Sequence, residues 1–288
     1  MATLSRLISG TMTWGEWGKK LSVSEQTALI ESIFEQGITT FDHADIYGHY
    51  TSEALFGKAF KDSQIKRDQV QWISKCGIQL PCKKRPLKVQ HYNFSKAHIE
   101  ESVHQSLQYL QTDYLDVLLL HRPSPLIKAN EIAEAVKPLV EAGKILSFGV
   151  SNFNPSQMRL LQEEFTLAWN QIECSISHPD PLFDGTLDFM QVNKIGAMAW
   201  GSLGAYFKTK NPWQKRVAQC LAPMIDKYEV SEAALLLAWL LKHPANIYPV
   251  LGSTSPSRWE AMVKAIQIEL DLQDWFLLLE AAKGEPVP

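Results

Sequence analysis

The sequence predicts an α/β fold of the (β/α)8 or TIM barrel class, built as a single domain from residues 1–288. Short apolar segments rich in β-branched and aromatic residues alternate with longer segments that carry apolar residues at helical spacing, from one end of the chain to the other. The length lies within the range of barrels that fold as one domain. An open doubly wound sheet is the alternative, but the sequence lacks the G-x-G-x-x-G turn that normally follows its first strand.

Eight segments have the composition of buried strands. In the second, Ile38-Thr39-Thr40-Phe41 is a short run of β-branched and aromatic residues. In the fourth, the almost continuously apolar run 115–120 is typical of a strand buried on both faces, and Pro123 prevents its extension. The expected strands are residues 6–12, 37–42, 70–75, 115–120, 145–150, 167–172, 195–200 and 247–251.

Helices are expected between these strands. Residues 24–36 carry their apolar side chains on one helical stripe, and Gly143 is a C-cap for the helix before it. The expected helices are residues 24–36, 52–60, 96–111, 128–142, 184–193, two within 213–243, 256–267 and 272–283. Residues 76–95, which contain two prolines and a short basic run, are expected to form a long loop.

Composition and charge argue against several classes of protein. A formal net charge of -3 leaves no basic surface for nucleic acid. Four scattered cysteines suggest neither a disulfide framework nor a zinc site, so a cytoplasmic protein with reduced thiols and no metal is expected. No signal peptide is evident, and the longest apolar run, 233–241, is far shorter than the about 20 residues of a membrane span.

The second expected strand ends in a cluster of titratable residues, Asp42, His43, Asp45 and Tyr47. Taken alone, this cluster fits a polar loop before a helix as well as it fits a catalytic site. The other strand ends strengthen the catalytic reading, because barrel enzymes build their sites from the carboxyl ends of strands. Polar or aromatic residues stand at nearly all of these ends, namely Lys75, His121, Ser151, Asn152, Gln171, Trp200 and Ser253. Taken one at a time, each of these residues is explained equally by core packing or by a position in a surface loop, without a catalytic role.

The residue types at this rim fit the protonation of an oxygen atom on which negative charge builds. A tyrosine loses its proton near pH 10 in water, and the ammonium of Lys75 would lower the pKa of Tyr47. Asp42 would hold the lysine, and His121 could bind a carbonyl oxygen or relay the proton. The implied reaction is an addition to a carbonyl group. Nothing indicates an activated serine instead, since the G-x-S-x-G motif is absent.

A second group of residues suits a nicotinamide dinucleotide. Trp200 offers a flat face for a planar ring, and Asn152 and Gln171 offer amide groups for its carboxamide. The segment 252–254, followed by Arg258 in the first turn of a helix, supplies N–H groups, hydroxyls and a guanidinium where barrels often bind phosphate. Arg258 would favour NADP(H) over NAD(H) by binding a 2′-phosphate.

From Gly10 to about residue 283 the chain resembles the aldo-keto reductase family, and most closely the bacterial oxidoreductases that carry His-Arg-Pro after the fourth strand. The motifs that carry the resemblance are Gly10-Thr11-Met12, Phe41-Asp42-His43-Ala44-Asp45-Ile46-Tyr47-Gly48, Ile73-Ser74-Lys75-Cys76-Gly77, Asp116-Val117-Leu118-Leu119-Leu120-His121-Arg122-Pro123, Gly149-Val150-Ser151-Asn152-Phe153, Asn170-Gln171-Ile172-Glu173 and Gly252-Ser253. The resemblance implies a (β/α)8 barrel that binds NADP(H) and reduces aldehydes or ketones to alcohols by hydride transfer.

The resemblance also implies roles for individual residues. Tyr47 would be the general acid of a catalytic tetrad completed by Asp42, Lys75 and His121. The cofactor-binding residues implied are Thr11, Met12, Asp42, Ser151, Asn152, Gln171, Trp200, Gly201, Ser202, Leu203, Gly252, Ser253, Thr254 and Arg258. Gly252 stands where many relatives have a lysine, so this chain has one cation fewer near the 2′-phosphate.

Two other functions compete with this one. A non-catalytic NADP(H)-binding regulatory or interaction subunit would keep the barrel, but such members of the family tend to carry asparagine in place of His121. A metal-dependent hydrolase would use His43, His49, His121 and Asp42. The expected partner is a small carbonyl substrate, not a nucleic acid or a membrane, and the expected state is a monomer or weak homo-oligomer. The loops expected around the pocket carry Trp14, Trp17, His49, Tyr50 and Phe207, which suits an apolar or aromatic aldehyde. The same aromatic residues fit equally well as packing under the loops.

Overall fold

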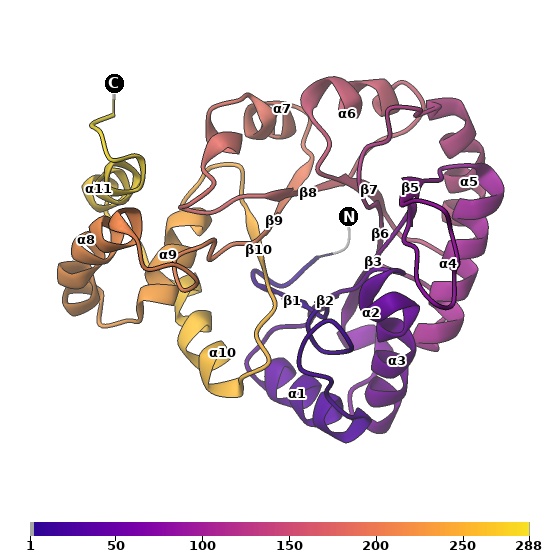
Figure 1. Cartoon of the computed structure of the whole chain (residues 1–288), viewed down its shortest axis with the longest axis horizontal. Coiled ribbons are helices and arrows are strands. Elements are labelled where there is room, and N and C mark those ends of the chain that lie inside the picture. The colour runs from indigo at the N-terminus through magenta and orange to yellow at the C-terminus, as the bar shows by residue number, and fades with distance from the viewer. Residues whose placement is uncertain (1–2, 288) are drawn as a thin grey trace.

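A computed structural model describes residues 3–287 and contains a closed barrel of eight parallel strands in the order β1-β10-β9-β8-β7-β6-β3-β2. Figure 1 shows these strands at the centre with the helices around them. The barrel strands are β1 (Ile8–Gly10), β2 (Thr40–Asp42), β3 (Gln71–Cys76), β6 (Val117–Leu120), β7 (Phe148–Ser151), β8 (Trp169–Glu173), β9 (Gly196–Trp200) and β10 (Tyr248–Leu251). The predicted barrel class is confirmed, and each of the eight expected strand segments overlaps one barrel strand.

The helices fill the connections between strands, as a parallel sheet requires. They are α1 (Val23–Glu35), α2 (Tyr47–Tyr50), α3 (Ser52–Asp62), α4 (Lys96–Leu110), α5 (Ala129–Glu141), α6 (Pro155–Gln162), α7 (Thr186–Val192), α8 (Pro212–Tyr228), α9 (Glu232–Leu241), α10 (Pro256–Val263) and α11 (Leu272–Lys283), with short 3₁₀ helices η1 (Arg67–Gln69), η2 (Asp180–Leu182) and η3 (Lys264–Gln267). None of the helices within residues 3–287 combines the length and the apolarity that a membrane span needs.

Two local expectations were incomplete. The segment 76–95 is not loop throughout, because β4 (Ile78–Gln79) and β5 (His91–Tyr92) pair antiparallel within it. Helix α6, which connects β7 to β8, was not anticipated. Its start has a capping box of Asn154 and Gln157, with Pro155 at the first turn, so the local signal for a helix is present in the sequence. Its eight residues bury only Met158 and Leu161, which is too short an apolar stripe to stand out.

The strand register brings the polar strand ends to one edge of the barrel. Asp42 pairs with both Gly10 of β1 and Ile73 of β3. Farther round the barrel, Ser151 of β7 pairs with Gln171 of β8. Because all eight strands are parallel, their carboxyl ends meet at the same rim, where TIM-barrel active sites lie.

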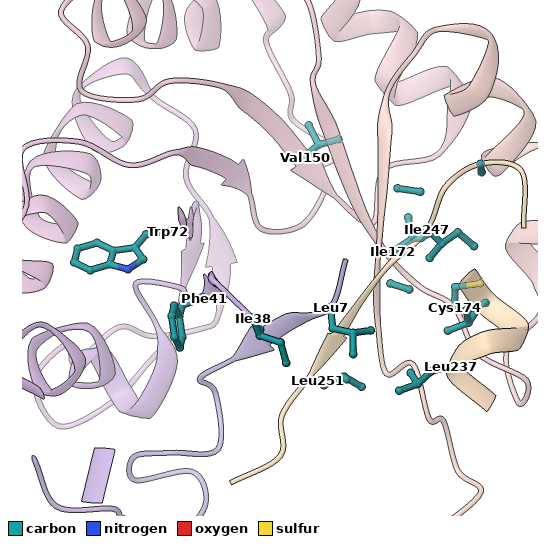
Figure 2. Packing of buried hydrophobic residues seen from close by; sticks show 14 of the residues in the cluster. Leu7, Ile38, Phe41, Trp72, Val150, Ile172, Cys174, Leu237, Ile247 and Leu251 are labelled. Carbon is teal, nitrogen blue, oxygen red and sulfur yellow. The ribbon is translucent and has the colours of Figure 1, made fainter. Parts of the chain in front are cut away.

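Two clusters of buried apolar side chains stabilise the barrel. Inside it, residues such as Ile73, Leu119 and Met198 form a small cluster around Trp169, which can lie there because its neighbours are glycines. A Cβ atom on Gly196 would come within 2.3 Å of the Trp169 ring, so no larger residue fits that position. The larger cluster lies between strands and helices, where Figure 2 shows side chains such as Phe41 and Trp72.

Helix α9 explains the longest apolar run of the sequence. All seven residues from Ala234 to Leu240 are buried, because the helix packs against β10, α8, α10 and η3 together. A helix covered on all sides needs apolar residues around its whole circumference. The run is therefore a buried core helix.

Candidate active site

Lys75 lies at the centre of the polar rim, at the end of β3, with only 1% of its side chain exposed. Its ammonium nitrogen lies 2.7 Å from Asp42 Oδ2, 2.8 Å from the His43 carbonyl oxygen and 3.1 Å from the Tyr47 hydroxyl oxygen. A lysine ammonium has three N–H donors and no acceptor, so these three contacts use all of them. Tyr47 must therefore accept from Lys75, and its own O–H proton is left free for another acceptor.

Asp42 is held from two sides. Its Oδ2 accepts from Lys75, and its Oδ1 accepts from Gln171 Nε2 at 2.9 Å. These two donors come from strands β3 and β8, which are not neighbours in the barrel, so the carboxylate joins opposite parts of the rim. A buried carboxylate requires such partners, because desolvation without compensation costs several kcal/mol.

The chain after β2 turns Tyr47 back over the barrel. The residues that follow, Gly48, His49 and Tyr50, all have positive φ angles of 57°, 52° and 64°. At Gly48 a Cβ atom would lie 2.6 Å from Ser52 Oγ, so both the space and the backbone conformation favour glycine there. This left-handed turn keeps the Tyr47 side chain buried beside Lys75.

Burial changes the ionisation of the tyrosine–lysine pair. Burial raises the pKa of Tyr47 more than the ammonium of Lys75 lowers it, so the pKa of Tyr47 lies above its usual value of 10.0. The net direction is therefore opposite to the one expected from the sequence, although the effect of Lys75 has the expected sign. For Lys75, burial lowers the pKa, and the nearby Asp42 and Tyr47 outweigh that effect and raise it. Both groups are protonated at neutral pH.

His121 stands beside Tyr47, with ring centroids 5.9 Å apart and an interplanar angle of 73°. Its backbone N–H donates to the Cys76 carbonyl, which extends the pairing of β6 with β3 by one residue. Burial, followed by the nearby charges of Lys75 and Arg122, holds the pKa of His121 well below its usual range. The imidazole is therefore neutral at neutral pH, and its buried Nδ1 atom has no hydrogen-bond partner within residues 3–287.

Trp200 is anchored at the rim through a short chain of side chains. Its Nε1 donates to Asn152 Oδ1 at 2.8 Å, and Asn152 Nδ2 donates to Ser151 Oγ at 2.8 Å. Ser151 Oγ in turn donates to the Gln171 carbonyl at 3.0 Å. The chain fixes the plane of the indole, and Asn152, with a φ of 62°, retains one amide hydrogen for a further acceptor.

The start of α10 forms a separate polar site on the same rim. Ser255 is the N-cap residue but its side chain makes no capping hydrogen bond. Pro256 has no N–H and Arg258 N donates to the Ser255 carbonyl at 3.1 Å, so the Ser257 N–H is the first-turn group that remains available. Ser255 N donates to Ser253 Oγ at 3.3 Å, and the two residues lie with Arg258, whose side chain is exposed, in one turn of chain. A helix N-terminus with an arginine in its first turn is suited to phosphate.

The remaining residues implied as cofactor contacts have varied surroundings. Thr11 is buried, and its hydroxyl contacts the Asp42 carbonyl and His43 Nδ1, both at 3.0 Å. Ser202 is buried too, and its hydroxyl donates to the carbonyls of Ala199 and Val250, so it holds the turn after β9. Met12, Gly201, Leu203, Gly252 and Thr254 lie on the loops at the carboxyl ends of β1, β9 and β10, and each is exposed or half-buried.

The aromatic residues expected around the pocket separate into two groups. Trp17 packs on Tyr47 with ring centroids 6.0 Å apart and donates to the His49 ring. Trp14, by contrast, is 1% exposed and packs on Phe41 and Phe56 in the main core, so of its two expected places it takes the one under the loops. An aromatic residue on a loop gives no sign of which way it points, and only the packing decides.

Sequence reasoning missed Glu53, which is 2% exposed on α3. Its carboxylate accepts from Ser74 Oγ at 2.6 Å and from Ser106 Oγ at 3.1 Å. Burial raises the pKa of Glu53 to about 7, despite these hydroxyl donors and the charge of Lys75. A glutamate at helical spacing looks like a surface residue in a sequence, so nothing in the local pattern marks it.

The residues considered for a metal site do not converge. Within residues 3–287, no three His, Cys, Asp or Glu side chains are grouped in a way that could hold a metal ion. His43 is buried against Phe56, with ring centroids 4.3 Å apart, and His49 pairs with Glu16 near the surface. The geometry thus gives no support to a metal-dependent hydrolase.

The closed parallel barrel and the buried lysine, aspartate and tyrosine at its carboxyl rim define a TIM-barrel protein with a polar site in the usual position for a barrel enzyme. The chain belongs to the aldo/keto reductase family, which it matches over residues 6–282, so the resemblance noted in the sequence is confirmed. It is 42% identical to the uncharacterized oxidoreductase YcsN of Bacillus subtilis, with 99% of this chain and 96% of that protein aligned. It is 38% identical to the 6-dehydroglucose reductase of Agrobacterium fabrum, with coverage of 99% and 96%.

A solved structure supports the same conclusion. The crystal structure of an aldo/keto reductase from Klebsiella pneumoniae, in complex with NADP and acetate, superposes with a TM-score of 0.81 at 25% identity. The superposition covers 99% of this chain and 93% of the other.

Proposed function

We propose that this protein reduces aldehydes or ketones to alcohols with NADPH as the hydride donor, and that Tyr47 is the general acid. The observation that carries the proposal is the hydrogen bond at 3.1 Å in which Tyr47 accepts from Lys75. This contact points the phenol proton away from Lys75 and places a positive charge beside the oxygen that loses it. Such a pair suits proton transfer to an oxygen that becomes negative during the reaction.

In this mechanism Tyr47 gives the proton, and Lys75 stabilises the phenolate that remains. The pKa of Tyr47 is raised, so the tyrosine is protonated and able to act as an acid across neutral pH. After proton transfer the phenolate is stabilised by the ammonium 3.1 Å away, which Asp42 and the His43 carbonyl hold in place. The carboxylate neutralises the buried ammonium and fixes its direction.

The substrate carbonyl would lie beside Tyr47 and His121, whose ring centroids are 5.9 Å apart in an edge-to-face arrangement. A neutral imidazole can donate one hydrogen bond without adding a charge to the site, and the low pKa of His121 keeps it neutral. Two donors aimed at one oxygen would orient the carbonyl and stabilise developing negative charge. This geometry argues for an enzyme and against a non-catalytic subunit.

The residues present fit an NADP(H) cofactor. When bound, NADPH supplies the hydride. The face of Trp200 would support the nicotinamide ring, and the free amide hydrogen of Asn152 together with Gln171 would bind its carboxamide. At the other end, the uncapped start of α10 and the exposed Arg258 would hold the phosphates. The related Klebsiella pneumoniae structure, which contains NADP, supports this assignment.

The test is a panel of aldehydes and ketones, followed by loss of NADPH absorbance. We expect turnover of at least one member of the panel, and quenching of tryptophan fluorescence by NADPH because Trp200 would lie against the nicotinamide. NADPH binding without turnover of any carbonyl compound would instead favour the non-catalytic subunit. The panel should include oxidised sugars, because the Agrobacterium fabrum relative is named as a 6-dehydroglucose reductase.

A further inference from the structure

Arg122 reaches across the mouth of the barrel. It follows His121 at the end of β6, and its guanidinium carbon lies 5.3 Å from the centre of the Trp200 ring at the end of β9. Strands β7 and β8 separate β6 from β9 in the barrel, so this side chain spans part of the rim. Its charge also acts on Tyr47 and His121, since it lowers the pKa of both. The guanidinium therefore lies close to the place where the carbonyl would react.

The donors of Arg122 have no acceptor within residues 3–287. Its guanidinium forms neither a salt bridge nor a hydrogen bond there, and it lies over the Trp200 indole ring. Arg67 provides the contrast, because it is also half-buried and lies over a tryptophan, at 4.2 Å. Arg67, however, donates to Thr112, Val70, Tyr114 and Asp116. Arg67 therefore has acceptors for its donors, whereas Arg122 has none within residues 3–287. Arg6, which lies over the Tyr248 ring, also lacks an acceptor, so what sets Arg122 apart is its place beside His121 and Trp200 at the rim.

We propose that Arg122 recognises the substrate, by donating two parallel hydrogen bonds to a pair of oxygen atoms close to the reacting carbonyl. The pair is either two neighbouring hydroxyls or a carboxylate. This inference rests on the proposed reductase function and narrows it, because an oxygen-rich carbonyl compound replaces the apolar aldehyde suggested by the aromatic loop residues.

The chemistry of the guanidinium leads to this substrate class. A cation–π contact engages the charge and leaves the N–H donors free, and these form a rigid fork that matches two oxygens side by side. None of the Arg122 nitrogens is a fully buried polar atom without a partner, so water can reach them, and a ligand with two acceptors can replace that water. An apolar aldehyde would leave the fork unsatisfied, whereas an oxygenated one would satisfy it.

The test compares matched substrates in the NADPH-bound enzyme and its Arg122→Met and Arg122→Lys variants. Glyceraldehyde is paired with propanal, and succinic semialdehyde with butanal, so that each pair differs in its oxygens. We expect Arg122→Met to lower the ratio of kcat/KM within at least one pair by about tenfold or more, the effect of a charge-assisted hydrogen bond. Arg122→Lys keeps the charge and loses the fork, so part of the loss should remain. The pair that responds identifies hydroxyls or a carboxylate as the partner.

Several results would overturn the proposal. If both ratios stay as in the wild type while all rates fall together, Arg122 acts through Tyr47 or Trp200 and does not touch the substrate. If the loss is instead a weaker NADPH affinity, Arg122 belongs to the cofactor site.

Calorimetry of glycerol and 4-hydroxybutyrate binding to the NADP⁺ complex, with butanol as the control, measures the same contact without turnover. A wild type that binds these ligands yet reduces no aldehyde would refute the reductase and leave the recognition intact.

Discussion

The Lys75 ammonium nitrogen lies 2.7 Å from Asp42 Oδ2, and the two side chains are 1% and 3% exposed. A buried ion pair of this kind contributes little net stability compared with apolar residues, but the removal of one partner typically costs about 3–5 kcal/mol. Lys75 also donates to Tyr47, so the same ammonium serves both the fold and the reaction. Substitutions can separate the two contributions.

Lys75→Met should abolish carbonyl reduction and leave NADPH binding within a few-fold of the wild type. The methionine keeps most of the side-chain volume but removes the charge that stabilises the Tyr47 phenolate. The free energy of unfolding should also fall, because Asp42 is left with Gln171 as its one side-chain donor. Steady-state turnover, NADPH titration by fluorescence and urea unfolding measure the three quantities.

The matched control for Lys75→Met is the double variant that also carries Asp42→Asn. It removes both charges, so much of the lost stability should return while activity stays lost. If the single variant cannot bind NADPH even when it is folded, the catalytic assignment of Lys75 is wrong.

Arg258→Met should weaken NADPH binding by about 1.5–3 kcal/mol and leave NADH binding nearly unchanged. The reason is that Arg258 is placed to bind the 2′-phosphate, which NADH lacks. Lys264→Met, which removes an exposed cation from η3 beyond the end of α10, serves as the control for a general loss of positive charge. Fluorescence titrations of both cofactors give the values. An equal loss for NADPH and NADH would remove Arg258 from the phosphate site.

Much of the barrel could be predicted from the sequence, because alternating strand and helix patterns leave few ways to bury both faces of a parallel sheet. Asp42 and Lys75 could be placed on one rim for the same reason, since parallel strands bring their carboxyl ends together. Helix α6 was missed because its two buried residues, Met158 and Leu161, form too short a pattern. The inward turn of Trp14 depends on contacts with residues distant in sequence.

Ionisation was the part of the site that the sequence could not predict. Lys75 lowers the pKa of Tyr47 as expected, but burial raises it further, and burial depends on the whole fold. The same holds for Glu53, which lies far from Ser106 in the sequence and meets it only where α3 packs on α4. Effects of this kind become visible only when the tertiary packing is known.

Glu53→Gln should change the pH dependence of stability. The pKa of Glu53 is about 7 in the folded protein and 4.5 in its ordinary state, so the folded state binds its proton more tightly. The stability that this group contributes is therefore complete below about pH 4.5 and is lost as the pH rises through 7. Glutamine keeps the shape and does not titrate, so this loss should disappear.

The difference between the two pKa values of Glu53 corresponds to a free energy of unfolding of about 3 kcal/mol. Relative to Glu53→Gln, the wild type should lose roughly that free energy of unfolding between pH 4.5 and pH 8. Urea unfolding at several pH values measures it. Glu134→Gln, a change at an exposed glutamate of α5, should follow the wild type throughout. If the free energy of unfolding of the wild type and of Glu53→Gln changes with pH in parallel, Glu53 is not the source of the pH dependence.

Tyr47→Phe provides the most direct test of the proposed mechanism. The substitution keeps the ring and removes the hydroxyl that accepts from Lys75 and gives its proton to the substrate. General acid catalysis contributes about 10²–10⁴-fold, so reduction of the best carbonyl substrate should fall by at least 100-fold. The contacts proposed for the cofactor do not involve the hydroxyl, so the affinity for NADPH should barely change.

The pH profile separates loss of the acid in Tyr47→Phe from loss of structure. The acid is active while protonated, so wild-type reduction should decline as the pH rises through the pKa of Tyr47, which burial places above 10.0. Turnover and NADPH binding are measured on the purified variant, with Tyr50→Phe as the control, because Tyr50 bonds to Leu80 and not to Lys75. The variant at Tyr47 should lose this high-pH decline together with its activity, whereas the variant at Tyr50 should keep both. If Tyr47→Phe retains more than about a tenth of the wild-type turnover, the loss is smaller than a general acid requires, and the proton must come from another group.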